Sequence, residues 1–240
     1  MNLKYVPLLR AQRELYDLPR GWERFQEYLK TMVDDATGGI KLPLSGMNPM
    51  GKEHLPALLD EYLSFDADDL AARAVAEVAP DIAGAFKVAL VLCDDAQGGW
   101  TNRYATEFTQ RFQSRAMRKR GWLVGALWTT EKPSPEAARE EVLTTTWRGA
   151  YLQTHGFAAT LREMLAQEGY AQTRAGVAQW LEEEDLAYTA EVIAPYLDAT
   201  DLPTQMVCVF GDEAAHSLGY APLGLSKRAG LAWALQHFNA

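Results

Sequence analysis

Cysteine and long apolar runs are both scarce in this sequence, and their scarcity excludes several classes of protein. The two cysteines, Cys93 and Cys208, lie in separate short apolar segments, which excludes a disulfide framework and a paired-cysteine metal site. No apolar run approaches the roughly 20 residues that a membrane-spanning helix needs. The first residues lack a signal-peptide pattern. We therefore expect a soluble, cytoplasmic protein with no membrane partner.

Positive charge is also in short supply. The chain has 23 Lys+Arg against 32 Asp+Glu and a net charge of −9, which disfavours partners that carry phosphate backbones. The basic cluster at residues 111–120 lies at the end of a predicted helix, where the helix dipole favours positive charge. Nucleic acid is therefore disfavoured as a partner, whereas a small-molecule ligand is compatible with this composition. The sequence leaves the oligomeric state open.

Three short apolar runs predict the strands of a small sheet. They span residues 88–93, 122–128 and 206–210, and their length favours buried strands. A weaker run at 40–44 contains Pro43, which restricts it to a sheet edge. Because helical patterns separate the runs, the strands should be mostly parallel. We predict a helix-rich α/β fold in which helices surround a sheet of three to four strands.

The helical patterns also bear on domain organisation. Residues 1–85 read as helical, with Trp22, Phe25 and Leu29 on one helix face. Thr160 and Glu163 form a capping-box pattern that begins a later helix, which we expect to end at Gly169. We expect a single domain over residues 1–240. The alternative is a helical subdomain at 1–85 followed by an α/β core at 86–240.

Acidic residues follow each of the predicted strands. Asp94 comes after the first, Glu131 after the second and Glu213 after the third. The carboxyl ends of parallel strands meet at one edge of a sheet, where open α/β sheets bind ligands. We therefore predict Asp94 and Glu213 as catalytic residues. The alternative is that these carboxylates cap the helices that follow them.

Two loops offer groups that suit a ligand. The loop at 46–53 resembles a phosphate-binding loop, but Glu53 stands where such a loop needs Ser or Thr to hold magnesium. Its Asn48 and Lys52 remain candidate substrate-binding residues, because functional side chains favour loops on a rigid scaffold. In the second loop, at 94–104, Trp100 and Arg103 are further candidates. Gly98 and Gly99 would let that backbone approach a ligand closely.

A polar stripe marks the helix predicted to end near His155. Thr144, Arg148, Tyr151 and His155 recur at spacings of three and four, so they share one helix face. If that face lines a cavity, Arg148 would bind an anion, Tyr151 would contact substrate and His155 would act as a catalytic base. The alternative is that the stripe faces solvent.

A Glu-x-x-His pair suggests a metal site. Glu213 and His216 would share one helix face and supply two ligands, and His54 or His155 would complete the set. The cofactor is otherwise unknown. Together these features favour an enzyme with a hydrolase or group-transfer site at the strand ends, with or without a divalent metal. The alternative is a non-catalytic subunit that binds a small molecule or a protein.

Overall fold

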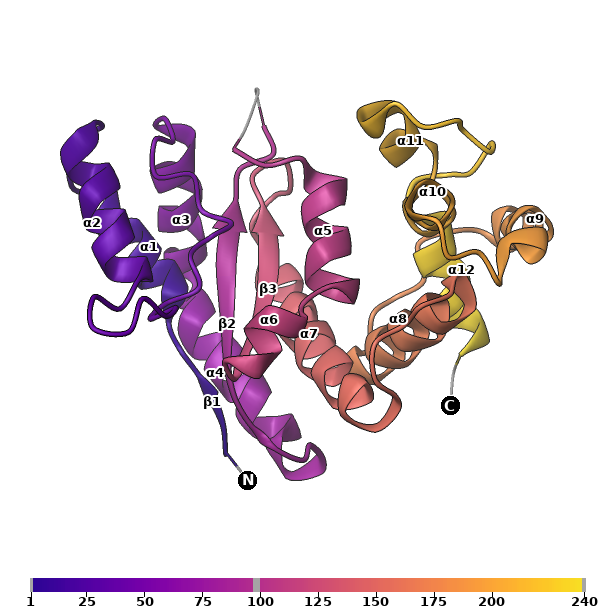
Figure 1. Ribbon diagram of the computed structural model, residues 1–240, viewed down its shortest axis with the longest axis horizontal. Helices are drawn as coiled ribbons and strands as arrows, with labels where there is room; N and C mark the ends of the chain where they lie inside the picture. Colours follow the sequence, from indigo (N-terminus) through magenta and orange to yellow (C-terminus); the bar gives the residue numbers. More distant parts are fainter. Residues whose placement is uncertain (1, 97–99, 239–240) are drawn as a thin grey trace. The chain divides into compact units, whose positions relative to one another are not determined.

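The computed structural model describes residues 2–96 and 100–238, and the chain divides into two compact units (Figure 1). Unit 1 comprises Met1–Thr106 and Ser114–Thr146, and unit 2 comprises Glu107–Gln113 and Trp147–Ala240. The alternative predicted from the sequence, a division of the chain at residue 85, does not coincide with the boundary between these two units. Gly98 and Gly99 lie outside the described residues. Within those described, none of the helices combines the length and apolarity needed to cross a bilayer.

Unit 1 contains a three-stranded sheet and the helices packed on it. Its strands are β1 (Asn2–Tyr5), β2 (Ala85–Cys93) and β3 (Trp122–Trp128). Its other elements are α1 (Leu8–Leu15), α2 (Trp22–Met32), α3 (His54–Ser64), α4 (Ala67–Val78), the 3₁₀ helix η1 (Ala79–Asp81), α6 (Arg115–Lys119), and parts of α5 (Arg103–Phe112) and α7 (Pro135–His155). The prediction of a helix-rich α/β fold is confirmed.

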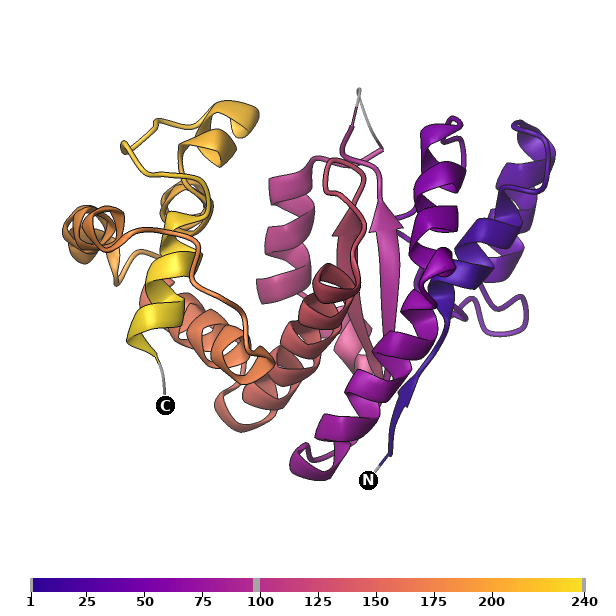
Figure 2. The same ribbon diagram turned by 180° about the vertical axis from the view of Figure 1, so that it is seen from behind.

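The sheet has the order β1-β2-β3, and all its described pairings are parallel (Figures 1 and 2). The runs at 88–93 and 122–128 form β2 and β3, as predicted. Strand β1 was not predicted, and it makes the N-terminal segment part of the sheet. The run at 40–44 is not a strand, because Ile40 forms only an isolated antiparallel bridge with Val33.

A glutamine side chain continues the sheet where β1 has ended. The amide of Gln12, on α1, donates from Nε2 to the Leu92 carbonyl at 2.8 Å and accepts from the Leu92 amide at 3.0 Å. Gln12 is fully buried. It therefore satisfies two backbone groups of β2 at a point that the described pairing with β1 does not reach, two residues before Asp94.

Substituting this glutamine tests the pairing. In Gln12→Met, which keeps the shape but not the polar atoms, the buried amide and carbonyl of Leu92 lose their partners. We expect the free energy of unfolding to fall by about 2 kcal/mol, measured by urea denaturation. The same change at the exposed Gln26 should cost less than about 0.5 kcal/mol. Equal losses in the two variants would contradict this account.

Unit 2 is helical in its described residues. Besides parts of α5 and α7, it contains α8 (Leu161–Ala175), α9 (Glu183–Ile193), the 3₁₀ helix η2 (Ala194–Tyr196), α10 (Leu202–Phe210), α11 (Asp212–Leu218) and α12 (Ala229–His237). Helix α12 packs against α8, α9 and α10 (Figure 2).

The prediction of a strand at 206–210 is wrong, because this segment is the second half of α10. Its start was readable: Asp201 accepts a hydrogen bond from the Thr204 amide at 3.0 Å, and Pro203 occupies the first turn. Residues 205–210 are all buried. A helix buried on all sides and a buried strand show the same continuous apolar run.

The capping box at Thr160 is confirmed, but the helix it begins does not end at Gly169. Helix α8 continues to Ala175, and Gly176 takes the left-handed conformation after it, with φ 75°. Gly169 instead lies inside the helix at a close approach to α12. A Cβ there would lie 2.4 Å from the Ala234 carbonyl oxygen.

Candidate active site

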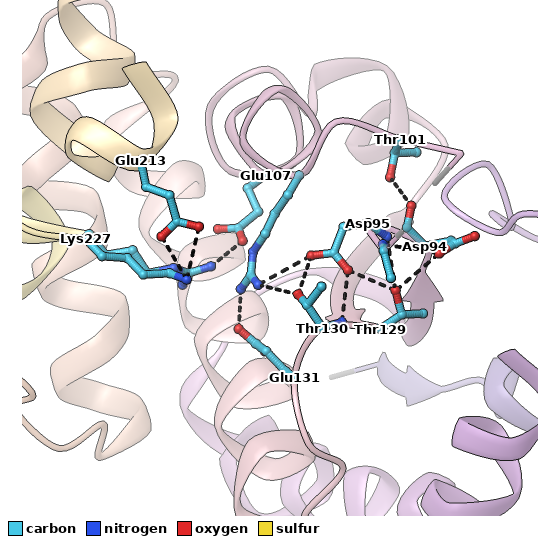
Figure 3. A network of polar contacts seen from close by, with 12 residues as sticks. Asp94, Asp95, Thr101, Glu107, Thr129, Thr130, Glu131, Glu213 and Lys227 are labelled. Atoms are coloured by element: carbon cyan, nitrogen blue, oxygen red, sulfur yellow. Dashed lines mark hydrogen bonds and ion pairs between the residues drawn. The ribbon is translucent and has the colours of Figure 1, made fainter. Parts of the chain in front are cut away.

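The carboxyl ends of β2 and β3 bring polar side chains together in unit 1 (Figure 3). Asp95 follows β2 and accepts hydrogen bonds from the Thr129 hydroxyl at 2.9 Å and the Thr130 hydroxyl at 2.6 Å, both of which follow β3. Arg103 links Asp95 to Glu131. The expectation that acidic residues after these two strands lie at one edge of the sheet is therefore confirmed.

Arg103 lies within the protein and braces these strand ends. Its guanidinium contacts Asp95 at 3.5 Å, donates to the Thr130 hydroxyl at 3.2 Å and pairs with Glu131. It also lies over the Trp128 ring. A guanidinium that is 9% exposed and held by these groups orders the loops after β2 and β3. The sequence suggested Arg103 as a substrate contact, and the structure shows its guanidinium engaged by groups of the protein itself.

Asp94 is the buried centre of the cluster. It is 2% exposed, and its Oδ2 accepts a hydrogen bond from Asn48 Nδ2 at 2.8 Å. Its Oδ1 lies 3.2 Å from His54 Nε2. Asp94 and Asn48 were both predicted site residues, and the structure brings them into direct contact.

His54 was considered from the sequence only as a metal ligand, and the structure gives it a different partner. It is the first residue of α3, where the buried Leu55 and Leu59 anchor the helix. The loop before it turns at 48–51, where the Gly51 amide donates to the Asn48 carbonyl at 3.0 Å, and a Cβ at Gly51 would lie 2.0 Å from Leu55 Cδ1. The His54 side chain is 30% exposed. It thus contacts a buried carboxylate on one side and reaches the surface on the other.

The loop that carries Asn48 is fastened by side chains from the α1–α2 region. Tyr16 donates its hydroxyl to the Asn48 carbonyl at 2.6 Å, Arg20 donates to the Met50 carbonyl at 3.0 Å, and Arg24 contacts the Gly51 carbonyl at 3.4 Å. These donors engage backbone carbonyls, so they fix the path of the loop. No strand directly precedes this loop in the described chain, which also distinguishes it from a phosphate-binding loop.

The remaining candidates of unit 1 lie at the surface. Lys52 is exposed, and Trp100 is 48% exposed. The residue after Trp100, Thr101, donates its amide and its hydroxyl to the Asp94 carbonyl, each at 3.3 Å (Figure 3). These two hydrogen bonds anchor the residue next to Trp100 to the backbone of Asp94.

Three other candidates belong to unit 2. Arg148 is buried and forms an ion pair with Glu168 at 2.6 Å, so its charge is engaged within the protein. Tyr151 stacks on His155, with ring centroids 4.0 Å apart. His155 is exposed, and its Nδ1 lies 3.1 Å from the Tyr151 carbonyl. The polar stripe therefore has a buried start and an exposed end.

Glu213 and His216 lie on α11, which follows a helix and not a strand. The strand end at which Glu213 was expected to join Asp94 therefore does not exist. Both side chains are exposed, and Glu213 forms an ion pair with Lys227 at 3.0 Å (Figure 3). Across residues 2–96 and 100–238, no group of three or more His, Cys, Asp or Glu side chains is arranged to hold a metal ion.

The basic cluster at 111–120 is partly used within the protein. Arg111 is buried in unit 2, where it pairs with Glu107 and Glu168. Arg118, in unit 1, lies over the Phe86 ring.

Comparison with known proteins gives no match to a family model, to a curated protein or to a solved structure. We therefore infer a function from the geometry of the chain's own residues.

Proposed function

We propose that this protein is an enzyme that uses His54 as a general acid–base in a hydrolysis or group-transfer reaction. The observation that supports the proposal is the contact between His54 Nε2 and the buried carboxylate of Asp94, at 3.2 Å. A histidine held by a carboxylate and partly open to solvent is a common arrangement for moving protons in catalysis. The sequence offered Asp94, His155 and Glu213 as catalytic residues. The proposal keeps Asp94 and puts His54 in place of the other two.

The pairing assigns a role to each nitrogen of the imidazole. When Nε2 carries the proton, it donates to Asp94 and leaves Nδ1 as the proton acceptor. Nδ1 would then take a proton from water or from a substrate hydroxyl as that oxygen attacks. The Asp94 carboxylate would stabilise the imidazolium that forms, and the imidazolium would return the proton to the leaving group.

Lys52 and Trp100 are the proposed substrate contacts. Lys52 lies two residues before His54, and Trp100 lies in the segment that Thr101 fastens to Asp94. Both side chains are exposed, so they can contact a ligand without breaking the core. An ammonium and an indole face suit a substrate that carries an anionic group and a flat ring.

A substrate screen with matched histidine variants tests the proposal. The wild type is assayed against esters, amides, phosphoesters and glycosides, and with acyl and phosphoryl donors. We expect His54→Gln to lower the rate on any substrate by about 100-fold or more, the range for a general acid–base. His216→Gln changes an exposed histidine of unit 2 and should leave the rate unchanged. A His54→Gln variant with the wild-type rate would refute the proposal.

A protein-binding role is the second candidate. Helix α2 exposes Trp22 (68%) and Leu29 (38%), although the sequence pattern placed them on an apolar face with Phe25. The buried residues of this helix are Arg24 and Tyr28. Exposed aromatic side chains are enriched at interfaces. A wild-type protein that turns over no substrate in the screen would favour this non-catalytic role.

A further inference from the structure

We propose that Asn48 is a positioning residue that holds the Asp94 carboxylate in the orientation that pairs it with His54. The inference rests on the proposed function, since it concerns the same pair. Asn48 and His54 contact different oxygens of one carboxylate: Asn48 donates to Oδ2 and His54 lies against Oδ1. Donors on both oxygens limit rotation of the carboxylate about its Cβ–Cγ bond, so Oδ1 stays directed at His54.

Of the contacts that described residues make to the Asp94 carboxylate, that of Asn48 is the shortest. Its amide lies at 2.8 Å, whereas the Thr129 hydroxyl and the Ala96 amide lie 3.3 Å and 3.4 Å from Oδ1. Thr129 has a single hydroxyl proton, and its closer acceptor is Asp95, at 2.9 Å. That proton is therefore directed to Asp95. Among the residues that the structure describes, Asn48 is therefore the principal side-chain donor to Asp94 apart from His54.

The amide of Asn48 has one orientation that satisfies its surroundings. Its Oδ1 accepts a hydrogen bond from the Met50 amide at 3.0 Å, which places Nδ2 toward Asp94. The reverse orientation would set an amide oxygen against the carboxylate and an NH₂ group against the Met50 N–H. The turn at 48–50 therefore selects the donor that Asp94 needs.

The backbone of Asn48 is held as firmly as its side chain. Its carbonyl accepts the Tyr16 hydroxyl at 2.6 Å and the Gly51 amide at 3.0 Å. Tyr16 is 7% exposed. Burial raises the pKa of Tyr16, and the charge of Asp94 raises it further, so its hydroxyl stays protonated and available as a donor at neutral pH. Tyr16, Asn48, Asp94 and His54 thus form a continuous chain of contacts.

Nuclear magnetic resonance of the imidazole groups tests this role without a substrate. In protein labelled with ¹⁵N at its four histidines, the His54 signals are identified by their loss in His54→Gln. The measurement is the rate at which the His54 Nε2 proton exchanges with water. Asn48→Ser keeps the 48–50 turn, because a serine hydroxyl also accepts the backbone N–H, but it is too short to reach Asp94. Without the hydrogen bond from Asn48, the charged Asp94 carboxylate can rotate away from His54. We therefore expect the His54 Nε2 proton to exchange about tenfold faster or more, the scale for the loss of a hydrogen bond to a charged group.

A matched substitution and a second variant complete the design. Asn102 Oδ1 accepts the Ala105 amide at the start of α5, and a serine can cap there as well, so Asn102→Ser should leave the exchange rate unchanged. Tyr16→Phe removes the hydroxyl behind Asn48 and should give a smaller acceleration. It serves as the test if Asn48→Ser does not fold.

The outcomes separate this inference from the proposed function. An unchanged exchange rate in folded Asn48→Ser, or in Tyr16→Phe if that variant must be used, overturns the positioning role and leaves the His54–Asp94 pair intact. A wild-type protein in which His54 carries no proton on Nε2, or exchanges it as fast as free histidine, overturns the pair and with it the proposed function.

Discussion

Glu168→Gln should strongly destabilise unit 2. Glu168 is fully buried on α8. Its Oε1 accepts from Arg148 Nε at 2.6 Å and from Gln167 at 3.0 Å, and its Oε2 pairs with Arg111. Glutamine has nearly the same shape but no charge, so it would remove the carboxylate that the two buried guanidinium groups share. We expect the free energy of unfolding to fall by about 4 kcal/mol, as for other broken buried ion pairs.

The control is an ion pair at the surface of the same unit. Asp198 lies 3.3 Å from Arg162, and its side chain is 84% exposed. Asp198→Asn should therefore cost less than about 1 kcal/mol. Both variants are measured by urea denaturation at neutral pH, followed by circular dichroism. A Glu168→Gln loss no larger than the Asp198→Asn loss would show that the buried network contributes little.

The same network should respond to acid. Burial by itself raises the pKa of Glu168, but Arg148 and Arg111 outweigh burial and lower the pKa to about 2, from 4.5 in the absence of these effects. A carboxyl whose folded pKa lies below its unfolded value stabilises the fold above the unfolded pKa. This stabilisation is complete above pH 4.5 and is lost as the pH falls from 4.5 through 2. Glu168→Gln should remove that part of the acid sensitivity, so the wild-type and variant stabilities should converge as the pH falls.

Gly230→Ala should have the second largest effect, through backbone packing between two helices of unit 2. Gly230 lies in α12, and a Cβ at this position would lie 2.1 Å from the Cys208 carbonyl oxygen and 3.0 Å from the Val209 Cα of α10. These are backbone atoms, so the clash cannot be relieved by a change of rotamer. Alanine gains up to about 1 kcal/mol in helix propensity, but the helices must separate. We expect a net loss of about 3 kcal/mol.

Gly21→Ala provides the matched control. Gly21 precedes α2 with φ 160°, an extended conformation, and a Cβ there has no atom within 4 Å. Its replacement should cost no more than about 1 kcal/mol, the scale of a changed helix cap. Thermal unfolding of both variants checks the difference. If Gly230→Ala is as stable as Gly21→Ala, α10 and α12 do not approach each other this closely.

Part of the candidate site was predictable from short segments. The runs at 88–93 and 122–128 are strands, and the polar residues after them meet, because parallel strands end at one edge of the sheet. Asp94 could be proposed on these grounds, and Asn48 could be proposed because it lies in a loop with groups that suit a ligand. The pairing of Asp94 with His54 could not, because the two residues are 40 positions apart. No local pattern links residues that far apart. Arg148 looked like a ligand-binding residue from its helix face alone, and only packing revealed Glu168 beside it.

The sequence by itself determined that the apolar runs at 88–93, 122–128 and 206–210 are buried, where several helices begin, and that the fold is helix-rich α/β. These properties depend on apolar periodicity and caps, which are local. Tertiary structure alone decided that β1 completes the sheet. It also decided that residues 206–210 are helical, because helices on several sides bury that run as fully as neighbouring strands would. It brought His54 to Asp94, because the 45–53 loop is held by Tyr16, Arg20 and Arg24. Contacts between distant segments depend on how buried faces fit together, which is a property of the folded chain as a whole.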